Sequence, residues 1–242
     1  MRPAVVIPTY NEADNIGQLI EQLLALPQNL HVVVVDDSSP DGTGDIVEGL
    51  GSTGRVSLVR RPAKLGLGTA HLAGFAEAAR EGFDPILTMD ADFSHHPLEV
   101  PEMLRLSHGF DIVIGSRYVP GGGTRNCTLA RRVLSRIANQ VARTVLSLRA
   151  TDCTAGFRCY RKTVVDNLLR APIVANGYSF LVEVLYQAQR QGCSVGEVPI
   201  LFEDRRFGTS KISRQEVFRA AATVIRLALL RVRSVRLTEV AS

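Results

Sequence analysis

The sequence predicts an α/β fold in which helices cover both faces of a mostly parallel sheet. Short apolar runs at residues 4–7, 32–35, 56–59, 85–89 and 111–115 alternate with longer stretches of helical periodicity. Strands that lack polar alternation are buried on both faces, and helical connections place successive strands parallel. The 242 residues, 45% of them apolar, are enough for one large domain.

The helices predicted in the first half lie between these strands, at residues 13–26, 43–50, 68–82 and 98–107. No Gly-x-Gly-x-x-Gly follows the first strand, which argues against an ordinary dinucleotide site. A short glycine turn, Leu65-Gly-Leu-Gly68, starts the third helix, and its backbone N–H groups could face a phosphate. This alternation is typical of a doubly wound sheet.

The pattern changes after Arg117. Three glycines at 121–123 predict a flexible loop, and residues 129–148 predict a helix whose apolar residues share one stripe, typical of an amphipathic helix. The stripe consists of Leu134, Ile137, Val141, Val145 and Leu148. The remaining predicted elements are a helix at 178–190, a strand at 195–202 and a last helix at 215–232.

Charge divides the chain unevenly, although the net charge is only +4. Residues 1–116 contain 7 Lys or Arg and 16 Asp or Glu, whereas residues 117–242 contain 21 and 8. Because like charges repel in a compact fold, this division favours one half that binds a cation and one that binds an anion. We therefore expect one domain over 1–213, with halves at 1–116 and 117–213, followed by a basic amphipathic helix and tail over 214–242.

Cysteine and hydropathy patterns exclude several classes of protein. The four cysteines lack Cys-x-x-Cys spacing and are too few for a disulfide scaffold. No uncharged apolar run approaches the ~18 residues of a membrane span, and polar residues follow the first strand too soon for a signal peptide. Basic residues are not interleaved with aromatic ones, so nucleic acid is not an expected partner. We expect a soluble or surface-bound protein in a reducing cytosol.

Polar residues follow the strands at the edge where such sheets bind ligands. The segments are Pro8 to Glu12, Asp36 to Gly42, Asp90 to Asp92, and Ser116 with Arg117. Open α/β sheets bind ligands beyond the carboxyl ends of their strands. These four segments are therefore expected to converge on one crevice.

Asp90 and Asp92 are the strongest chemical signal in the chain. Residues two apart in an extended strand end point to the same side, so both carboxylates can face one cation. Mg²⁺ takes few protein oxygens and completes its shell with phosphate oxygens and water. A zinc site at His95 and His96 is one open alternative. A charged turn, in which Asp92 or Ser94 caps the next helix, is another.

Six separated segments, in order, resemble the polyprenol (dolichol) phosphate mannose synthases, which are inverting glycosyltransferases of the GT-A fold. They span residues 6–12, 35–43, 89–97, 115–118, 132–139 and 205–211. The resemblance covers roughly residues 4 to 215 and implies a Rossmann-like, mostly parallel sheet flanked by helices. Many members carry transmembrane helices after this domain, and none is predicted here.

The resemblance also implies roles for individual residues. The donor pocket would contain Pro8, Tyr10, Glu12, Val35, Asp37, Asp90, Ala91, Asp92, Arg117, Arg205 and Lys211. The metal, Mg²⁺ or Mn²⁺, would lie at Asp90, Asp92 and Ser94. The acceptor phosphate would contact Arg117, Arg131 and Ser135, which with Asp92 form the implied catalytic set.

The implied reaction transfers a mannosyl residue from GDP-mannose to polyprenyl phosphate with inversion. A phosphate monoester has a second pKa of about 6 and is already anionic at neutral pH, so no general base is required. Cations must instead contact both reacting groups, the leaving diphosphate and the acceptor phosphate. Transfer of glucose or another sugar from a UDP-sugar is the main alternative, and a nucleotidyltransferase or a non-catalytic binding module are two further ones.

The last predicted helix has a basic and an apolar face. Arg219, Arg226 and Arg233 recur at seven-residue spacing, and the apolar face contains Phe218, Ala222, Ile225, Leu229 and Val232. Such a helix can lie in an anionic membrane surface, or it can pack its apolar face on the domain. The expected location is the cytoplasm, peripheral on the cytoplasmic face of a membrane, and a separate membrane-anchoring protein is left open.

Overall fold

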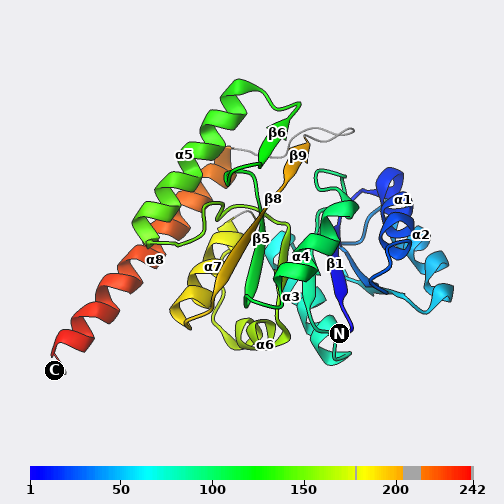
Figure 1. Ribbon diagram of the computed structural model, residues 1–242, viewed down its shortest axis with the longest axis horizontal. Helices are drawn as coiled ribbons and strands as arrows, with labels where there is room; N and C mark the ends of the chain where they lie inside the picture. The colour runs from blue at the N-terminus through cyan, green and yellow to red at the C-terminus, as the bar shows by residue number, and fades with distance from the viewer. Residues whose placement is uncertain (178, 204–213, 241–242) are drawn as a thin grey trace.

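The computed structural model describes residues 1–177, 179–203 and 214–240, and at 214–217 and 232–240 only the course of the helix (Figure 1). Its main sheet has the strand order β3-β2-β1-β4-β7-β5-β8. The strands are β1 (Ala4–Thr9), β2 (His31–Asp36), β3 (Val56–Arg60), β4 (Ile86–Thr88), β5 (Ile112–Ser116), β7 (Arg158–Tyr160) and β8 (Val195–Pro199). All pair in parallel except β7, which runs antiparallel to both β4 and β5. The predicted mostly parallel sheet is confirmed.

Helices cover both faces of this sheet and enclose two cores. The helices are α1 (Ala13–Leu24), α2 (Thr43–Leu50), α3 (Leu67–Arg80), α4 (Val100–Leu106), α5 (Leu129–Leu146), α6 (Lys162–Arg170), α7 (Ser179–Arg190) and α8 (Arg214–Val240), with short 3₁₀ turns at Gly51–Thr53 and Pro97–Glu99. Successive residues of β1 enter opposite cores: Val5 packs with α1, α2 and α4, and Val6 packs with α3, α6 and α7. This alternation explains why the strands are apolar throughout.

Close packing of α3 on the sheet requires a glycine. A Cβ atom at Gly74 would overlap the side chain of Val6 on β1. The helix therefore lies directly on the strand whose end carries Pro8 and Tyr10, which fixes one wall of the edge where the polar residues gather.

Two short strands, β6 (Gly123–Arg125) and β7, and the helix α6 were not predicted from the sequence. β7 has three residues and includes Arg158, whose buried guanidinium donates to the carbonyls of Cys153, Ala155 and Leu181. A buried arginine does not give an apolar signal, so β7 was not predicted. The strand expected at 195–202 is two strands, because β8 joins the main sheet and β9 (Leu201–Glu203) pairs with β6. The glycine segment expected to be a flexible loop thus ends in a strand.

The two helices α5 and α8 lie together at one end of the molecule, opposite α1 and α2 (Figure 1). The helix of α5 is confirmed, but its apolar stripe does not face a core: Leu134, Ile137, Val141 and Val145 are 41–56% exposed, and of the predicted stripe only Leu148, beyond the helix, is buried. The side chains that α5 buries are Asn139, Ala142 and Leu146. The amphipathic pattern predicted the helix correctly, but the apolar stripe is not the face that the helix buries.

α8 also turns its apolar side outward. Phe218, Ile225 and Leu229 are 60–75% exposed, whereas Arg226 donates to the fully buried carboxylate of Glu183 on α7, with 2.7 Å between Nη2 and Oε1. The interpretation in which the apolar face packs on the domain is therefore wrong for the described residues, as is a wholly solvated arginine face. Val232 and Arg233, and the expected domain boundary at residue 213, lie outside the described side chains.

Candidate functional site

The carboxyl ends of β1, β2 and β4 lie side by side, and β5 is one strand further away. The intervening β7 is antiparallel, so its first residue lies at the same edge as the last residues of its neighbours. The loop before β7, residues 151–157, consequently enters the site. Sequence reasoning placed four segments in the crevice and missed this fifth one.

The donor side begins at the ends of β1 and β2, where Pro8 and Val35 are direct neighbours in the sheet register. Beyond Pro8, the ring of Tyr10 has the ammonium of Lys64 3.7 Å from its centroid, a cation–π contact that joins two loops. Glu12 precedes α1, and its Oε2 accepts from Asn15 Nδ2 at 3.0 Å. The predicted members of the donor pocket on β1 and β2 are thus together.

Asp37 is held by protein groups rather than left open. Its Oδ1 lies 2.9 Å from Arg61 Nη1, and both side chains are buried. Its Oδ2 accepts from the backbone N–H groups of Leu65 and Gly66 at 3.1 and 3.0 Å. The glycine turn singled out in the sequence therefore donates to a carboxylate of the protein itself, and Asp37 fixes the course of that turn.

Asp90, Asp92 and Ser94 follow β4 in a tight turn. Asp92 and Ser94 are buried, and Asp92 Oδ1 accepts from the backbone N–H of Ser94 at 3.1 Å. The hydroxyl of Ser94 has no hydrogen-bond partner among the described residues. Across the turn lies Gly156, where even a Cβ atom would stand 3.6 Å from both carboxylate oxygens of Asp90. Residues 90–94 therefore contain a buried carboxylate, a second, more exposed one and an unsatisfied hydroxyl.

These oxygens fit Mg²⁺ or Mn²⁺ better than zinc. Within the described residues no group of three or more His, Cys, Asp or Glu side chains is arranged to hold a metal, which disfavours a cage made of protein alone. Mg²⁺ needs only one or two carboxylates when a phosphate and waters supply the rest. His96 uses its Nδ1 to accept from Leu98 N–H at 3.2 Å, so it caps the following turn. The zinc alternative at His95 and His96 is not supported.

His95 is buried beside the carboxylates. It stacks on Phe157 with ring centroids 5.2 Å apart and meets the edge of Phe202 at 5.5 Å. The pKa of His95 is lowered to about 4, chiefly because burial disfavours the charged ring; the charge of Asp92 opposes this shift and that of Arg117 adds to it. His95 is therefore neutral at pH 7, and its 3.8 Å approach to Asp90 is not an ion pair.

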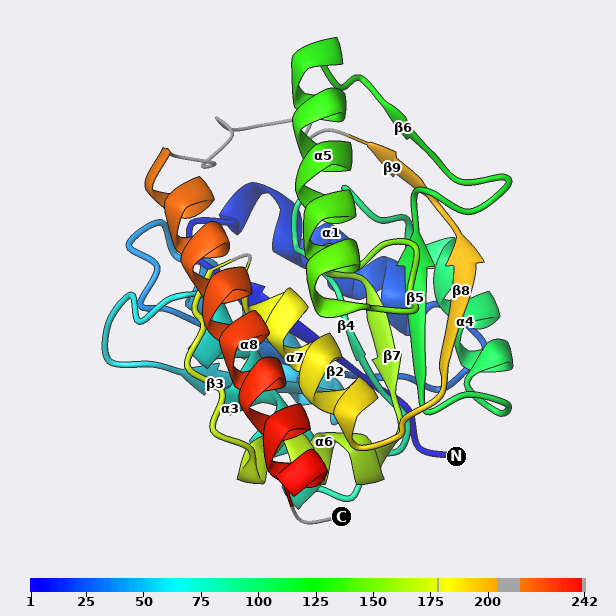
Figure 2. The ribbon, with the colours of Figure 1, turned by 90° about the vertical axis from the view of Figure 1, so that its left-hand side faces the viewer.

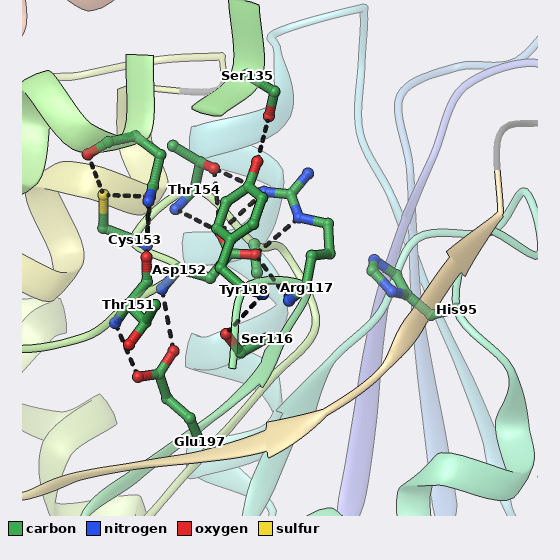
Figure 3. Close-up of polar contacts among 12 residues, drawn as sticks. His95, Ser116, Arg117, Tyr118, Ser135, Thr151, Asp152, Cys153, Thr154 and Glu197 are labelled. Carbon is green, nitrogen blue, oxygen red and sulfur yellow. Dashed lines mark hydrogen bonds and ion pairs between the residues drawn. The ribbon is translucent and has the colours of Figure 1, made fainter. Parts of the chain in front are cut away.

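Arg117 forms a bidentate pair with Asp152 at the end of β5 (Figure 3). Nε and Nη2 of Arg117 lie 2.7 and 2.8 Å from the two carboxylate oxygens, and Nη2 also donates to Thr154 Oγ1 at 2.7 Å. Burial raises the pKa of Asp152, but the hydrogen bonds and charge of Arg117 outweigh it and hold that pKa below its usual range. Arg117 thus favours the ionised form of Asp152, whose two oxygens already accept hydrogen bonds within the protein.

The loop that carries Asp152 is fixed from two other elements (Figure 3). Glu197 on β8 accepts from the backbone N–H groups of Thr151 and Asp152 at 2.7 and 3.0 Å. Asn139 on α5 accepts from Cys153 N–H at 2.9 Å and donates to Thr151 C=O at 2.6 Å. Burial raises the pKa of the Cys153 thiol to about 12, so this thiol is structural and not a nucleophile.

The acceptor side is completed by the first half of α5. The hydroxyls of Ser135 and Tyr118 are 2.9 Å apart, which places Ser135 beside the residue that follows Arg117. Arg131, one turn earlier, is half-buried at the start of the helix, where Thr128 Oγ1 accepts from its backbone N–H at 3.3 Å. Arg205 and Lys211 lie outside the described residues, so their expected places at the donor phosphates stay predictions.

A groove of about 540 Å³ runs between α5 and the segment after β5. The described residues that line it include three arginines and no acidic side chain: Arg117, Tyr118, Val119, Gly122, Arg136, Ile137, Asn139, Gln140, Arg143 and Thr151. The described part of the site therefore has carboxylates in the turn after β4 and arginines along the groove beside α5.

Comparison with known proteins identifies the family of this site. A sequence model of glycosyl transferase family 2 matches residues 4–169. The chain belongs to that family. Among its relatives is a polyprenol monophosphomannose synthase from Mycolicibacterium smegmatis, 41% identical over 97% of this chain and 91% of the relative. An undecaprenyl-phosphate mannosyltransferase from Micrococcus luteus is 38% identical over 95% of each chain. The resemblance found in the six sequence segments is confirmed.

Solved structures confirm the GT-A fold of this family 2 member. Glucosyl-3-phosphoglycerate synthase from Mycobacterium tuberculosis, crystallised with Mn²⁺, UDP and glucosyl-3-phosphoglycerate, superposes with a TM-score of 0.68 at 19% identity over 94% of this chain and 80% of that one. The same enzyme with Mg²⁺ and UDP gives 0.68 at 19% identity, over 94% and 79%. At this identity the likeness establishes the fold alone.

Proposed function

We propose that this glycosyltransferase moves a mannosyl residue from GDP-mannose to a polyprenyl phosphate, with inversion and with a divalent metal, and releases GDP. The observation that carries the proposal is the pairing of two unlike regions in one site: the Asp90 and Asp92 oxygens after β4, and arginines without a free carboxylate base beside them under α5. The names of the mycobacterial and Micrococcus relatives support a mannosyl donor and a polyprenyl phosphate acceptor.

Asp90, Asp92 and, through its unsatisfied hydroxyl, Ser94 would hold the metal. Bound there, Mg²⁺ or Mn²⁺ supplies positive charge to a diphosphate leaving group. Tyr10, Glu12 and the Pro8–Val35 pair form the neighbouring wall, where a nucleotide would lie. The ends of β1 and β2 would thus bind the nucleotide, and the turn after β4 would support the leaving group.

Among the described residues, the groove beside α5 is lined by no carboxylate that could remove a proton from an acceptor. Asp152 is the carboxylate that pairs with Arg117 on this side, and its two oxygens accept hydrogen bonds from Arg117 and Thr154. A hydroxyl acceptor would need a base to remove its proton, but a phosphate monoester is ionised already. Arg117, Arg131 and Ser135 would orient the phosphate oxygen and offset its charge as it approaches the donor.

Transfer from a UDP-sugar is the second candidate, because glucosyl-3-phosphoglycerate synthase shares the fold and was crystallised with UDP-glucose. The decisive experiment incubates the enzyme with Mn²⁺, a short-chain polyprenyl phosphate and GDP-mannose or UDP-glucose in parallel, followed by mass spectrometry of the lipid. Formation of mannosyl phosphoryl polyprenol from GDP-mannose alone is expected. A hexosyl lipid made only from UDP-glucose would replace the proposal with the second candidate.

The acceptor lipid implies a membrane-associated enzyme, which we place on the cytoplasmic face, where GDP-mannose would be available. No helix in the described part of the chain has the length and apolarity of a bilayer-crossing segment. Attachment through a surface of the domain or through a separate anchoring protein are the two routes that this leaves for the described residues. Fractionation of cells, with and without a high-salt wash, measures the association directly.

A further inference from the structure

The outer faces of α5 and α8 form a continuous apolar surface, which we call the α5–α8 face. Its side chains are each at least 41% exposed: Val133, Leu134, Ile137, Val141 and Val145 on α5, and Phe218, Ile225, Leu229 and Leu230 on α8. Both helices lie on the same side of the molecule (Figure 2). Arg231 of α8 donates to the carbonyl of Val145 at 3.3 Å, which joins the two helices within this surface.

These side chains are exposed because each helix packs on the domain through other residues. α5 is held by the buried Asn139, Ala142 and Leu146, and α8 by the buried Thr223 and Leu227 and by the Arg226–Glu183 pair. A groove of about 440 Å³ on α8 is lined by Ala222, Ile225, Arg226, Leu229 and Leu230. Monomeric soluble proteins rarely expose contiguous apolar surface of this kind unless something binds it.

We infer that the α5–α8 face docks on the surface of an anionic lipid bilayer. Apart from Arg131, which lies on the side of α5 that faces the domain, and Arg226, which is paired with Glu183, α5 carries Arg132, Arg136 and Arg143, and residues 218–231 of α8 carry Arg219 and Arg231. Neither stretch contains an acidic residue. Apolar side chains flanked by cations fit the boundary between acyl chains and anionic headgroups. Two copies of this chain apposed through the same face would bring arginines against arginines with no carboxylate to offset them, which disfavours a dimer.

Docking through this face has a direct consequence for the acceptor. The side of α5 that faces the domain carries Arg131 and Ser135, so one helix would touch the bilayer outside and the lipid phosphate inside. The inference rests on the proposed function for the identity of that acceptor. Its test does not, because vesicle binding is measured without donor, metal or transfer.

The experiment measures co-sedimentation of the full chain with vesicles of phosphatidylglycerol and phosphatidylcholine, and with phosphatidylcholine alone. Binding to the anionic vesicles is expected, and its absence in the unaltered protein overturns the inference. Leu134→Asn with Val141→Asn on α5, and Ile225→Asn with Leu229→Asn on α8, should each weaken the vesicle partition coefficient by roughly tenfold or more. The matched control is Ile46→Asn with Leu169→Asn, two exposed apolar residues on α2 and α6, which should bind as the unaltered protein does.

Two further measurements distinguish docking on lipid from dimerisation and from damage to the fold. Sedimentation velocity without lipid should show a monomer, and a dimer that the α5 and α8 variants dissociate while vesicle binding is unchanged would assign the face to a second copy. Transfer to a water-soluble short-chain acceptor should be retained by Leu134→Asn with Val141→Asn, while transfer to vesicle-embedded acceptor falls. Equal loss with both acceptors would show that these residues support the fold or the site and do not dock on lipid.

Discussion

At the carboxyl ends of the strands, charged side chains are buried in pairs, whereas on α5 and α8 large apolar side chains lie in solvent. Asp37 with Arg61 and Asp152 with Arg117 show the first arrangement, and Ile137 and Leu229 show the second. Both arrangements are costly in isolation, since a buried charge needs a partner and exposed apolar area is poorly hydrated. The buried charges at the strand ends have their partners within the protein. The exposed apolar side chains of α5 and α8 would be covered only by a binding partner.

The strongest test of the strand-end arrangement is Asp92→Asn. A neutral amide of the same shape weakens the hold on a divalent ion, so kcat should fall by about 100-fold or more while the melting temperature is little changed. Steady-state transfer at increasing Mn²⁺ gives the result. Asp45→Asn, which changes an exposed carboxylate paired with Arg60, is the control. Full activity of Asp92→Asn in the presence of a chelator would exclude metal binding by this pair.

Asp152→Asn tests whether the Arg117 pair is both structural and functional. Removing one partner leaves a guanidinium buried without its counter-charge, so the free energy of unfolding should drop by about 3 kcal/mol. Denaturant unfolding measures it, and the KM for the acceptor should rise more than the Kd for GDP. The comparison is Asp166→Asn in the partly exposed pair with Lys162, where less than about 1 kcal/mol is expected. Equal losses from the two variants would mean that burial does not strengthen the Arg117 pair.

Arg131→Ala tests whether this arginine belongs to the acceptor site and not to the donor site. Its half-buried position beside Ser135 on α5 predicts a KM for polyprenyl phosphate raised by roughly tenfold, equivalent to about 1.4 kcal/mol, with little effect on GDP binding. Calorimetry with GDP and kinetics with the acceptor give the two values, and Arg132→Ala on the exposed side of the helix is the control. A GDP affinity reduced as much as acceptor use would place Arg131 on the donor side.

A smaller effect is expected from pH, through the buried His71 of α3. Burial, assisted by the charge of Arg158, lowers the pKa of His71 to about 3. The unfolded chain therefore binds a proton below about pH 6.5 that the folded chain does not, so stability falls as pH decreases from 6.5 toward 3. His71→Gln should flatten this slope by about 1 kcal/mol per pH unit, measured by denaturant unfolding between pH 6.5 and 5. His108→Gln, an exposed histidine, is the control, and an unchanged slope in His71→Gln would contradict the assignment.

Much of the site was visible in the linear sequence because its residues follow strands directly. Tyr10, Asp37, Asp90 and Asp92 come immediately after apolar runs, and parallel strands necessarily end at one edge. Local rules were therefore enough to predict that they lie at one edge, and the resemblance of six sequence segments predicted the family that the relatives confirm. Asp152 was missed, because its position depends on an antiparallel strand of three residues that carries a buried arginine and has no periodic signal.

The sequence by itself determined the alternation of strands and helices, the carboxylate pair and the separation of negative and positive halves, since each depends on residues close in the chain. Only the tertiary structure decided which charged side chains are paired within the protein and which apolar side chains face outward. Arg117 meets Asp152 and Glu197 supports that carboxylate's loop through contacts 35 to 46 residues apart. The apolar stripe of α5 has the same periodicity whether it faces a core or a bilayer. Which side of a helix is buried depends on its packing against other helices. Those contacts join residues far apart in the sequence, so a local pattern does not predict them.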